Sequence, residues 1–248
     1  MKTLLIPCAG KSSRFPNMRP KWLLTHPDGK LMVQKAIEKI DLTQFDQVVF
    51  TIVREHDRKY GASLILRQAL ESSLQNMNIK MVVCILEDFT SSPSETIYLT
   101  AQKVGLQGLV VVKDSDNVVG LDGVTFKDNS VVGLNINKVK NVSNLPGKSF
   151  LIVNEQALLL DIVEKEIVSP LICLGVYIFK DIFYTALKQP AQLVQGVRGN
   201  IFASFDGIII GLGKPHFTEP ISCNTLFPHR PKQRFIANQS IHQSQGRG

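Results

Sequence analysis

The first 113 residues alternate between short apolar stretches and segments with helical periodicity, and this alternation constrains the fold more than any other feature. Apolar stretches of strand length cover residues 3–6, 47–53, 79–86 and 109–112. Helices are expected between them, over residues 32–40, 57–75 and 93–104. Strand–helix alternation of this kind is typical of a parallel sheet with helices on both faces. The sequence therefore predicts a three-layer α/β/α domain with a mostly parallel sheet.

Beyond Asn117 the pattern changes to short strand-like stretches separated by turn residues. Strands are expected over residues 118–120, 131–136, 150–153, 157–163 and 171–179, followed by a helix over residues 181–188. We interpret residues 118–170 as a β-rich insertion within one domain of residues 1–226. Residues 227–248 contain few apolar side chains and are predicted to form a basic, flexible tail.

A loop of small and basic residues follows the first apolar stretch. Small residues let the backbone approach a bulky anion, and such loops turn several N–H groups toward phosphate. Arg14 and Lys21 add two fixed positive charges, which suits a triphosphate. The alternative is a basic surface loop after an edge strand. The expected phosphate-binding residues are Pro7, Ala9, Gly10, Lys11, Ser12 and Ser13.

The loop lacks the spacing of a Walker loop and of the dinucleotide G-x-G-x-x-G motif. Residues 9–14 followed by Pro20-Lys21 instead resemble the A-G-x-G-x-R and P-K signature of sugar-phosphate nucleotidyltransferases, with Ser12 at the second glycine. The resemblance covers about residues 2–188. It implies a Rossmann-like nucleotidyltransferase fold and a Mg²⁺ cofactor, with Arg14 and Lys21 as catalytic residues.

Asp116 follows the stretch 109–112 and is the expected metal ligand. Mg²⁺ prefers oxygen ligands and often binds through one or two carboxylates and substrate phosphates. Asp116 matches the family pattern better than Asp114, and the alternative is an ordinary strand-end turn. For a second ligand late in the chain, Asn224 is the best match and Asp206 the alternative.

Two further segments resemble the family's substrate-binding parts. Ser94, Glu95 and Thr96 match a segment that helps to hold the base and ribose. The segment also suits a helix N-cap at Ser92 or Ser94, with Pro93 and Glu95 in the first turn. Glu164 and Lys165, with the later strand that contains Gly175, match the acceptor side: the lysine is expected on the acceptor phosphate and the glutamate on sugar hydroxyls.

The resemblance implies transfer of a nucleotidyl group from an NTP to a sugar 1-phosphate, or a related alcohol phosphate, with release of pyrophosphate. The product would be an activated NDP-sugar-type precursor, with surface-glycan synthesis as the expected use. The alternative is a non-catalytic protein of the same fold, which binds a nucleotide or a sugar phosphate and has a regulatory role.

The net charge of +7 does not indicate a nucleic-acid partner, because four of the excess positive charges lie in residues 229–248. No apolar run is long enough to span a membrane and no signal segment is evident, so a cytoplasmic protein is expected. The four cysteines are far apart and are expected to be reduced. The histidines are expected to be exposed rather than catalytic: His26, His56, His216, His229 and His242.

Overall fold

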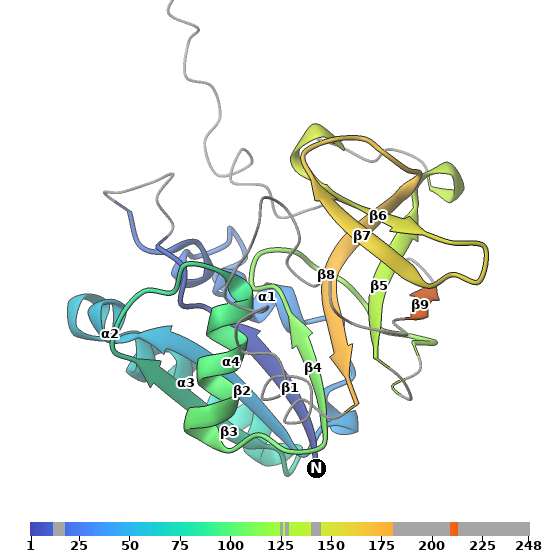
Figure 1. Ribbon diagram of the computed structural model, residues 1–248. Helices are drawn as coiled ribbons and strands as arrows, with labels where there is room; N and C mark the ends of the chain where they lie inside the picture. The colour runs from blue at the N-terminus through green and yellow to red at the C-terminus, as the bar shows by residue number, and fades with distance from the viewer. Residues whose placement is uncertain (12–17, 125, 127–128, 140–144, 181–208, 213–248) are drawn as a thin grey trace, which may run out of the picture.

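The computed structural model describes residues 1–11, 18–124, 126, 129–139 and 145–180, together with the backbone of 209–212. One mixed sheet runs through the molecule in the order β3-β2-β1-β4-β8-β5-β9, with β6 and β7 beside β8 (Figure 1). Its strands are β1 Lys2–Pro7, β2 Gln47–Val53, β3 Lys80–Leu86, β4 Leu109–Lys113, β5 Ser130–Asn135, β6 Ser149–Val153, β7 Leu159–Glu164, β8 Leu171–Phe179 and β9 Ile209–Leu212. The helices are α1 Met32–Ile37, α2 Arg54–Tyr60, α3 Ala62–Asn76 and α4 Pro93–Val104. The short 3₁₀ helices of the described ranges are η1 Lys21–Leu23, η2 Leu42–Gln44, η3 Ile136–Lys138 and η4 Leu145–Gly147.

Strands β1 to β4 are parallel to one another and form the predicted three-layer core. Side chains alternate between the faces of the sheet, so Leu4 packs in one cluster and Leu5 in the other. The first cluster contains residues of α1 and α3, such as Val33 and Leu66, and the second contains Ile97 of α4. Helices therefore cover both faces, which confirms the predicted α/β/α arrangement.

The remaining strands turn the sheet into a mixed one. β8 runs antiparallel to both β4 and β5, while β5 and β9 are parallel. β6 and β7 form an antiparallel hairpin that crosses in front of β8 and β5 in Figure 1. The expected strands near residues 131–136, 150–153, 157–163 and 171–179 are thus confirmed.

Two predicted elements differ from the structure. Gly61 adopts a left-handed φ of +63° and ends α2 before α3 begins, so the single helix expected over residues 57–75 is wrong. Residues 118–120 form no strand, although Val118 and Val119 are buried. Buried apolar residues in a short run cannot by themselves distinguish a strand from an irregular segment packed on the core. The helix expected over residues 181–188 and the tail lie outside the described residues.

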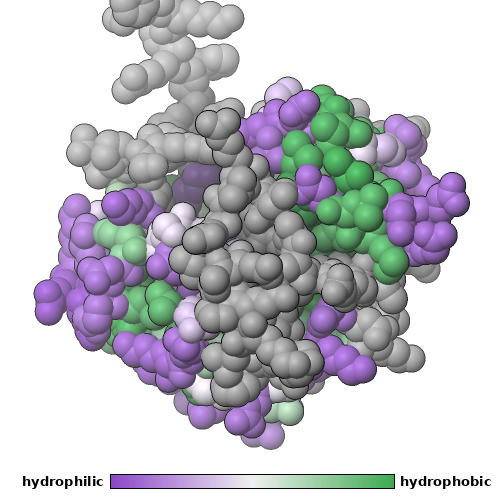
Figure 2. All heavy atoms as spheres, in the orientation of Figure 1, coloured by the Kyte–Doolittle hydropathy of each residue, from purple (hydrophilic) through white to green (hydrophobic). Residues whose placement is uncertain are grey.

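Apolar side chains are exposed on the β6–β7 hairpin and on the turn that follows it. Leu160 is 59% exposed, and Ile167 and Val168 are also exposed. Figure 2 shows a continuous hydrophobic area at this upper right part of the molecule. Across the residues that the structure places, no helix is long and apolar enough to cross a membrane.

Candidate active site

A cleft of about 570 Å³ opens where β1 and β4 end at the same edge of the sheet. In open α/β sheets, ligands bind outside the carboxyl ends of the strands. The volume lies within the range of about 300–1,000 Å³ that is usual for small-molecule sites. Its lining comes from four segments of the chain: residues 7–11, 21–22, 90–93 with 96, and 114–116.

Residues 7–11, the described part of the chain at the end of β1 and in the loop after it, line this cleft. The N–H of Cys8 donates to the Thr51 carbonyl at 2.7 Å, which continues the β1–β2 pairing by one residue. Ala9 is buried, whereas Gly10 and Lys11 are exposed, and among the described residues beyond its chain neighbours no atom lies within 4 Å of a Cβ built on Gly10. Within the part of the chain that the structure describes, space is therefore open beside the loop's backbone. Ser12, Ser13 and Arg14 lie outside the described residues.

Lys21 lies at the start of η1 and faces the loop that follows β4. Its Nζ is 3.5 Å from Oδ2 of Asp116, and both side chains are partly exposed. An ion pair of this kind contributes little to stability, on the order of 0–1 kcal/mol. The ion pair matters for the shape of the site, because it holds Lys21 and Asp116, two predicted site residues 95 positions apart in sequence, in the same cleft.

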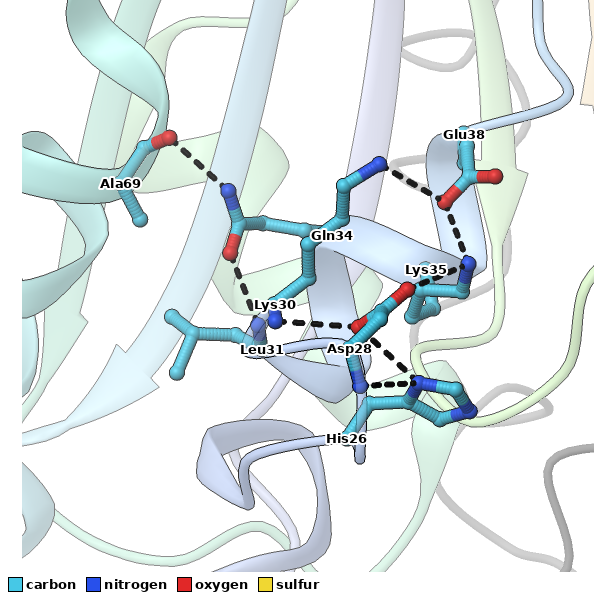
Figure 3. A network of polar contacts seen from close by, with 8 residues as sticks. All are labelled: His26, Asp28, Lys30, Leu31, Gln34, Lys35, Glu38 and Ala69. Atoms are coloured by element: carbon cyan, nitrogen blue, oxygen red, sulfur yellow. Dashed lines mark hydrogen bonds and ion pairs between the residues drawn. The ribbon is translucent and has the colours of Figure 1, made fainter.

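A polar network holds the chain that follows Lys21 (Figure 3). The amide of Gln34 on α1 accepts from the N–H of Leu31 at 2.8 Å and donates to the Ala69 carbonyl on α3 at 2.9 Å. Lys35 pairs with Asp28 at 3.0 Å, and this hydrogen bond lowers the pKa of the Asp28 carboxyl. The segment between η1 and α1 is thereby anchored to α3.

The turn after β4 brings two carboxylates to the cleft, Asp114 and Asp116. Asp116 is 46% exposed at its side chain, whereas Asp114 is half-buried against β8. Burial raises the pKa of Asp114 to about 6; the charge of Lys113 opposes this shift and that of Asp116 adds to it. Close carboxylates disfavour each other's ionised form unless a cation lies nearby.

Lys113 ends β4 with its side chain fully buried. Burial lowers the pKa of Lys113 to about 8, although the charges of Asp114 and Asp116 oppose the shift. At neutral pH the ammonium is therefore still mostly charged, and it contacts main-chain oxygens of the turn that carries the two carboxylates. Sequence reasoning missed this residue, because a lysine at a strand end is usually solvated.

The donor set at this turn fits a hard divalent cation. Oxygen ligands suit Mg²⁺, which commonly binds through one or two carboxylates and completes its shell with water and substrate phosphate. Asp114 and Asp116 are the described residues that could hold it. No group of three or more His, Cys, Asp and Glu side chains suited to a metal occurs in the described ranges. Asn224 and Asp206, the expected late ligands, lie outside those ranges.

The N-terminus of α4 forms the opposite part of the lining. Ser92 caps the helix by accepting from the N–H of Glu95 at 3.1 Å, and Glu95 accepts from the N–H and hydroxyl of Ser91 at 2.6 Å. Of the three expected nucleotide-binding residues here, Thr96 lines the cleft, Ser94 is buried and Glu95 holds the cap. The capping interpretation of this segment is confirmed.

The expected acceptor residues lie on the β-rich side. Glu164 ends β7 and is close enough to Tyr177 on β8 for its charge to add to the raised pKa of that phenol. Lys165 is exposed and has φ +61°, a region that residues other than glycine rarely adopt. Gly175 does not line the cleft but abuts Asp114, which does.

His56 is buried, so the expectation that it is exposed is wrong. Its ring lies 5.1 Å from that of Phe89 and 6.1 Å from that of Trp22, and it is 5% exposed. Nδ1 has no hydrogen-bond partner among the described residues. Burial lowers the pKa of His56. Two of the rings that cover it, those of Trp22 and Phe89, come from distant parts of the chain, whereas the ring of Tyr60, 6.3 Å away, is near in sequence. The burial of His56 therefore depends largely on contacts that the local sequence does not indicate.

This burial predicts a pH-dependent loss of stability. The free energy of unfolding should fall as the pH drops below 6.5, the ordinary value for histidine, because the unfolded chain then binds a proton that the folded state excludes. His56→Phe should reduce the loss between about pH 7.5 and pH 5.5, as measured by urea unfolding. Equal losses in the wild type and the variant would contradict the buried, neutral state of His56.

No protein-family model and no curated protein matches this sequence. The fold, by contrast, is similar to those of solved structures that share little sequence identity with this chain. A nucleoside-diphosphate-sugar pyrophosphorylase from Vibrio cholerae RC9 superposes with a TM-score of 0.61 at 18% identity, covering 84% of this chain and 91% of that one. An inositol-1-phosphate CTP transferase from T. maritima gives 0.60 at 12% identity, with coverage of 85% and 84%. HddC from Yersinia pseudotuberculosis gives 0.60 at 15% identity, with coverage of 86% and 90%.

Proposed function

We propose that this chain, which has the fold of the sugar-phosphate nucleotidyltransferases, transfers a nucleotidyl group from an NTP to a sugar 1-phosphate or a related alcohol phosphate. The observation that carries the proposal is the meeting of three features in one cleft: the open loop after β1, the ammonium of Lys21, and the carboxylates of Asp114 and Asp116. Similarity of fold alone would not establish an activity, since one fold hosts many functions.

In the proposed reaction an oxygen of the acceptor phosphate attacks the α-phosphorus of the NTP. A new P–O bond forms as the bond between the α-phosphorus and the bridging oxygen breaks, and pyrophosphate leaves with that electron pair. No general base is needed, because the acceptor phosphate is already ionised near neutral pH. Catalysis then depends on positioning and on the stabilisation of charge.

The residues of the cleft have distinct roles in this proposal. The backbone beside Gly10 receives the triphosphate, while Lys11 and Lys21 neutralise charge that grows on the leaving group. Arg14, in the same loop of the sequence, is proposed to share this role. Asp114 and Asp116 would hold Mg²⁺, which supplies positive charge to the phosphate oxygens. Asn224 remains a proposed further ligand.

Release of pyrophosphate tests the proposal directly. The purified protein would be assayed with Mg²⁺ and ATP, CTP, GTP, UTP or dTTP against a panel of sugar 1-phosphates and alcohol phosphates. Release with one NTP and one acceptor would support the transferase and identify its substrates. NTP binding without release on any acceptor would favour a non-catalytic binding protein, and absence of binding would contradict the assignment of the cleft.

Lys165 tests the acceptor side separately. Lys165→Ala should raise the KM for the acceptor about tenfold or more and leave the KM for the NTP nearly unchanged, because one charge-assisted contact to phosphate is lost. Alanine keeps the Cβ, so the strain of the left-handed backbone at this position is similar in both proteins. Lys138→Ala, at an exposed lysine of η3, is the matched control. A larger effect on the NTP than on the acceptor would show that the acceptor site lies elsewhere.

A further inference from the structure

The ammonium of Lys113 is enclosed beneath the turn that carries Asp116. It donates to the carbonyl oxygen of Asp114 at 2.6 Å and to that of Asn117 at 2.9 Å, and it also contacts Oδ1 of Asn117. One cation therefore joins the first and last residues of a four-residue turn. None of the ion pairs found in the described ranges involves Lys113, so its partners are neutral oxygens.

The same turn is tied to β8 at both ends. The N–H of Asp114 donates to the Gly175 carbonyl at 2.8 Å, and Nδ2 of Asn117 donates to the Leu174 carbonyl at 2.9 Å. Between these fixed ends lie Ser115 and Asp116, which line the cleft. The position of the Asp116 carboxylate is thus set by bonds that Lys113 and β8 make to its neighbours.

Lys113 has no access to a ligand in the cleft. Its side chain is 0% exposed and is absent from the described lining, unlike those of Lys11 and Lys21. A buried lysine is costly unless its donors are satisfied, and all three of its contacts are to oxygens of this one turn. The cost of burying the Lys113 ammonium is explained if the turn of residues 114–117 must keep a defined shape.

We infer that Lys113 is a positioning residue, which holds the turn of residues 114–117 so that Asp116 presents its carboxylate to a divalent cation. The inference rests on the proposed function, because Asp116 is assigned to the cation there. Residues that orient a metal ligand commonly change metal affinity by about 10- to 100-fold when they are mutated. The role differs from that of the cleft lysines, which act on the substrate itself.

The test measures binding of Mn²⁺, a paramagnetic substitute for Mg²⁺, by electron paramagnetic resonance, and does not depend on turnover. In the full-length protein Lys113→Met replaces the apolar stem of the lysine but removes the ammonium and its donors, and it should weaken Mn²⁺ binding about tenfold or more in protein that remains folded by circular dichroism. Lys103→Met is the matched control, because Lys103 also donates to a main-chain carbonyl, that of Ile85, but lies on α4 outside the described cleft lining. Its Mn²⁺ affinity should match that of the wild type.

A second variant covers the case in which Lys113→Met does not fold. Asn117→Ser removes one acceptor of the ammonium and the bond to Leu174, and it should weaken Mn²⁺ binding in the same direction. If both variants fold and bind Mn²⁺ as tightly as the wild type, the positioning role of Lys113 is overturned. If Lys113→Met does not fold, unchanged Mn²⁺ affinity in Asn117→Ser overturns it. Either result leaves the transferase proposal intact. Absence of Mn²⁺ binding by the wild type, with and without an NTP, would overturn the cation site and the role of Lys113 together.

Discussion

Asp116→Ala is expected to lower the rate of pyrophosphate release by about two to three orders of magnitude, while the protein stays folded. The carboxylate is partly exposed and forms one weak ion pair with Lys21, so its removal costs the fold little. In the proposed reaction, however, it contributes to binding the cation that offsets charge on the phosphates. The effect should therefore appear in kcat and in the requirement for Mg²⁺, measured at saturating NTP and acceptor.

A control close in sequence separates this effect from a general loss of charge. Asp122→Ala removes an exposed carboxylate six residues further on, outside the described lining of the cleft, and should leave turnover within about twofold of the wild type. Asp114 is a second oxygen donor in the same cleft, so a residual rate in Asp116→Ala is compatible with the proposal. Turnover within about tenfold of the wild type would remove Asp116 as a direct ligand.

The elements that the sequence predicts well are those whose signal is local. Strands β1 to β4 are short apolar stretches bounded by turn residues, and their alternation with helices determines a parallel sheet. The cap of α4 is equally local, because a serine followed by proline and glutamate is typical of a helix start. Gly61 has the same local character, but the apolar helical stripe that follows it, from Leu64 to Leu74, concealed the break.

The parts that sequence reasoning missed depend on contacts between distant segments. His56 is buried by Trp22 and Phe89, neither of which is near it in sequence. Lys113 is buried because the turn after it supplies oxygens to its ammonium, and a lysine at a strand end carries no sign of this. The family pattern favours Asp116 over Asp114, yet both line the cleft, and the N–H of Asp114 is held by the carbonyl of Gly175 on β8, a strand distant in sequence.

Gly175→Ala is the second change with a large expected effect, in this case on stability. Gly175 has φ +67°, and a Cβ built on it would lie 2.0 Å from Oδ2 and 3.0 Å from Cβ of Asp114. The left-handed backbone alone costs an alanine roughly 1 kcal/mol. Displacing Asp114 adds overpacking strain of about 1–3 kcal/mol. We therefore expect Gly175→Ala to lower the free energy of unfolding by about 3 kcal/mol in urea denaturation.

Gly105→Ala measures the backbone part of this effect alone, so the difference between the two variants gives the steric part. Gly105 has nearly the same backbone angle, φ +68°, but among the described residues beyond its chain neighbours no atom lies within 4 Å of its built Cβ, so only the cost of the backbone, about 1 kcal/mol, should appear. Adding Asp114→Ala to Gly175→Ala removes the two closest atoms and should recover part of the lost stability, a coupling that a double-mutant cycle measures. Equal losses at Gly105 and Gly175 would contradict the close packing of Asp114 on β8. Because Asp114 begins the turn that presents Asp116, a confirmed coupling would link the packing of the β-rich side to the geometry of the cleft.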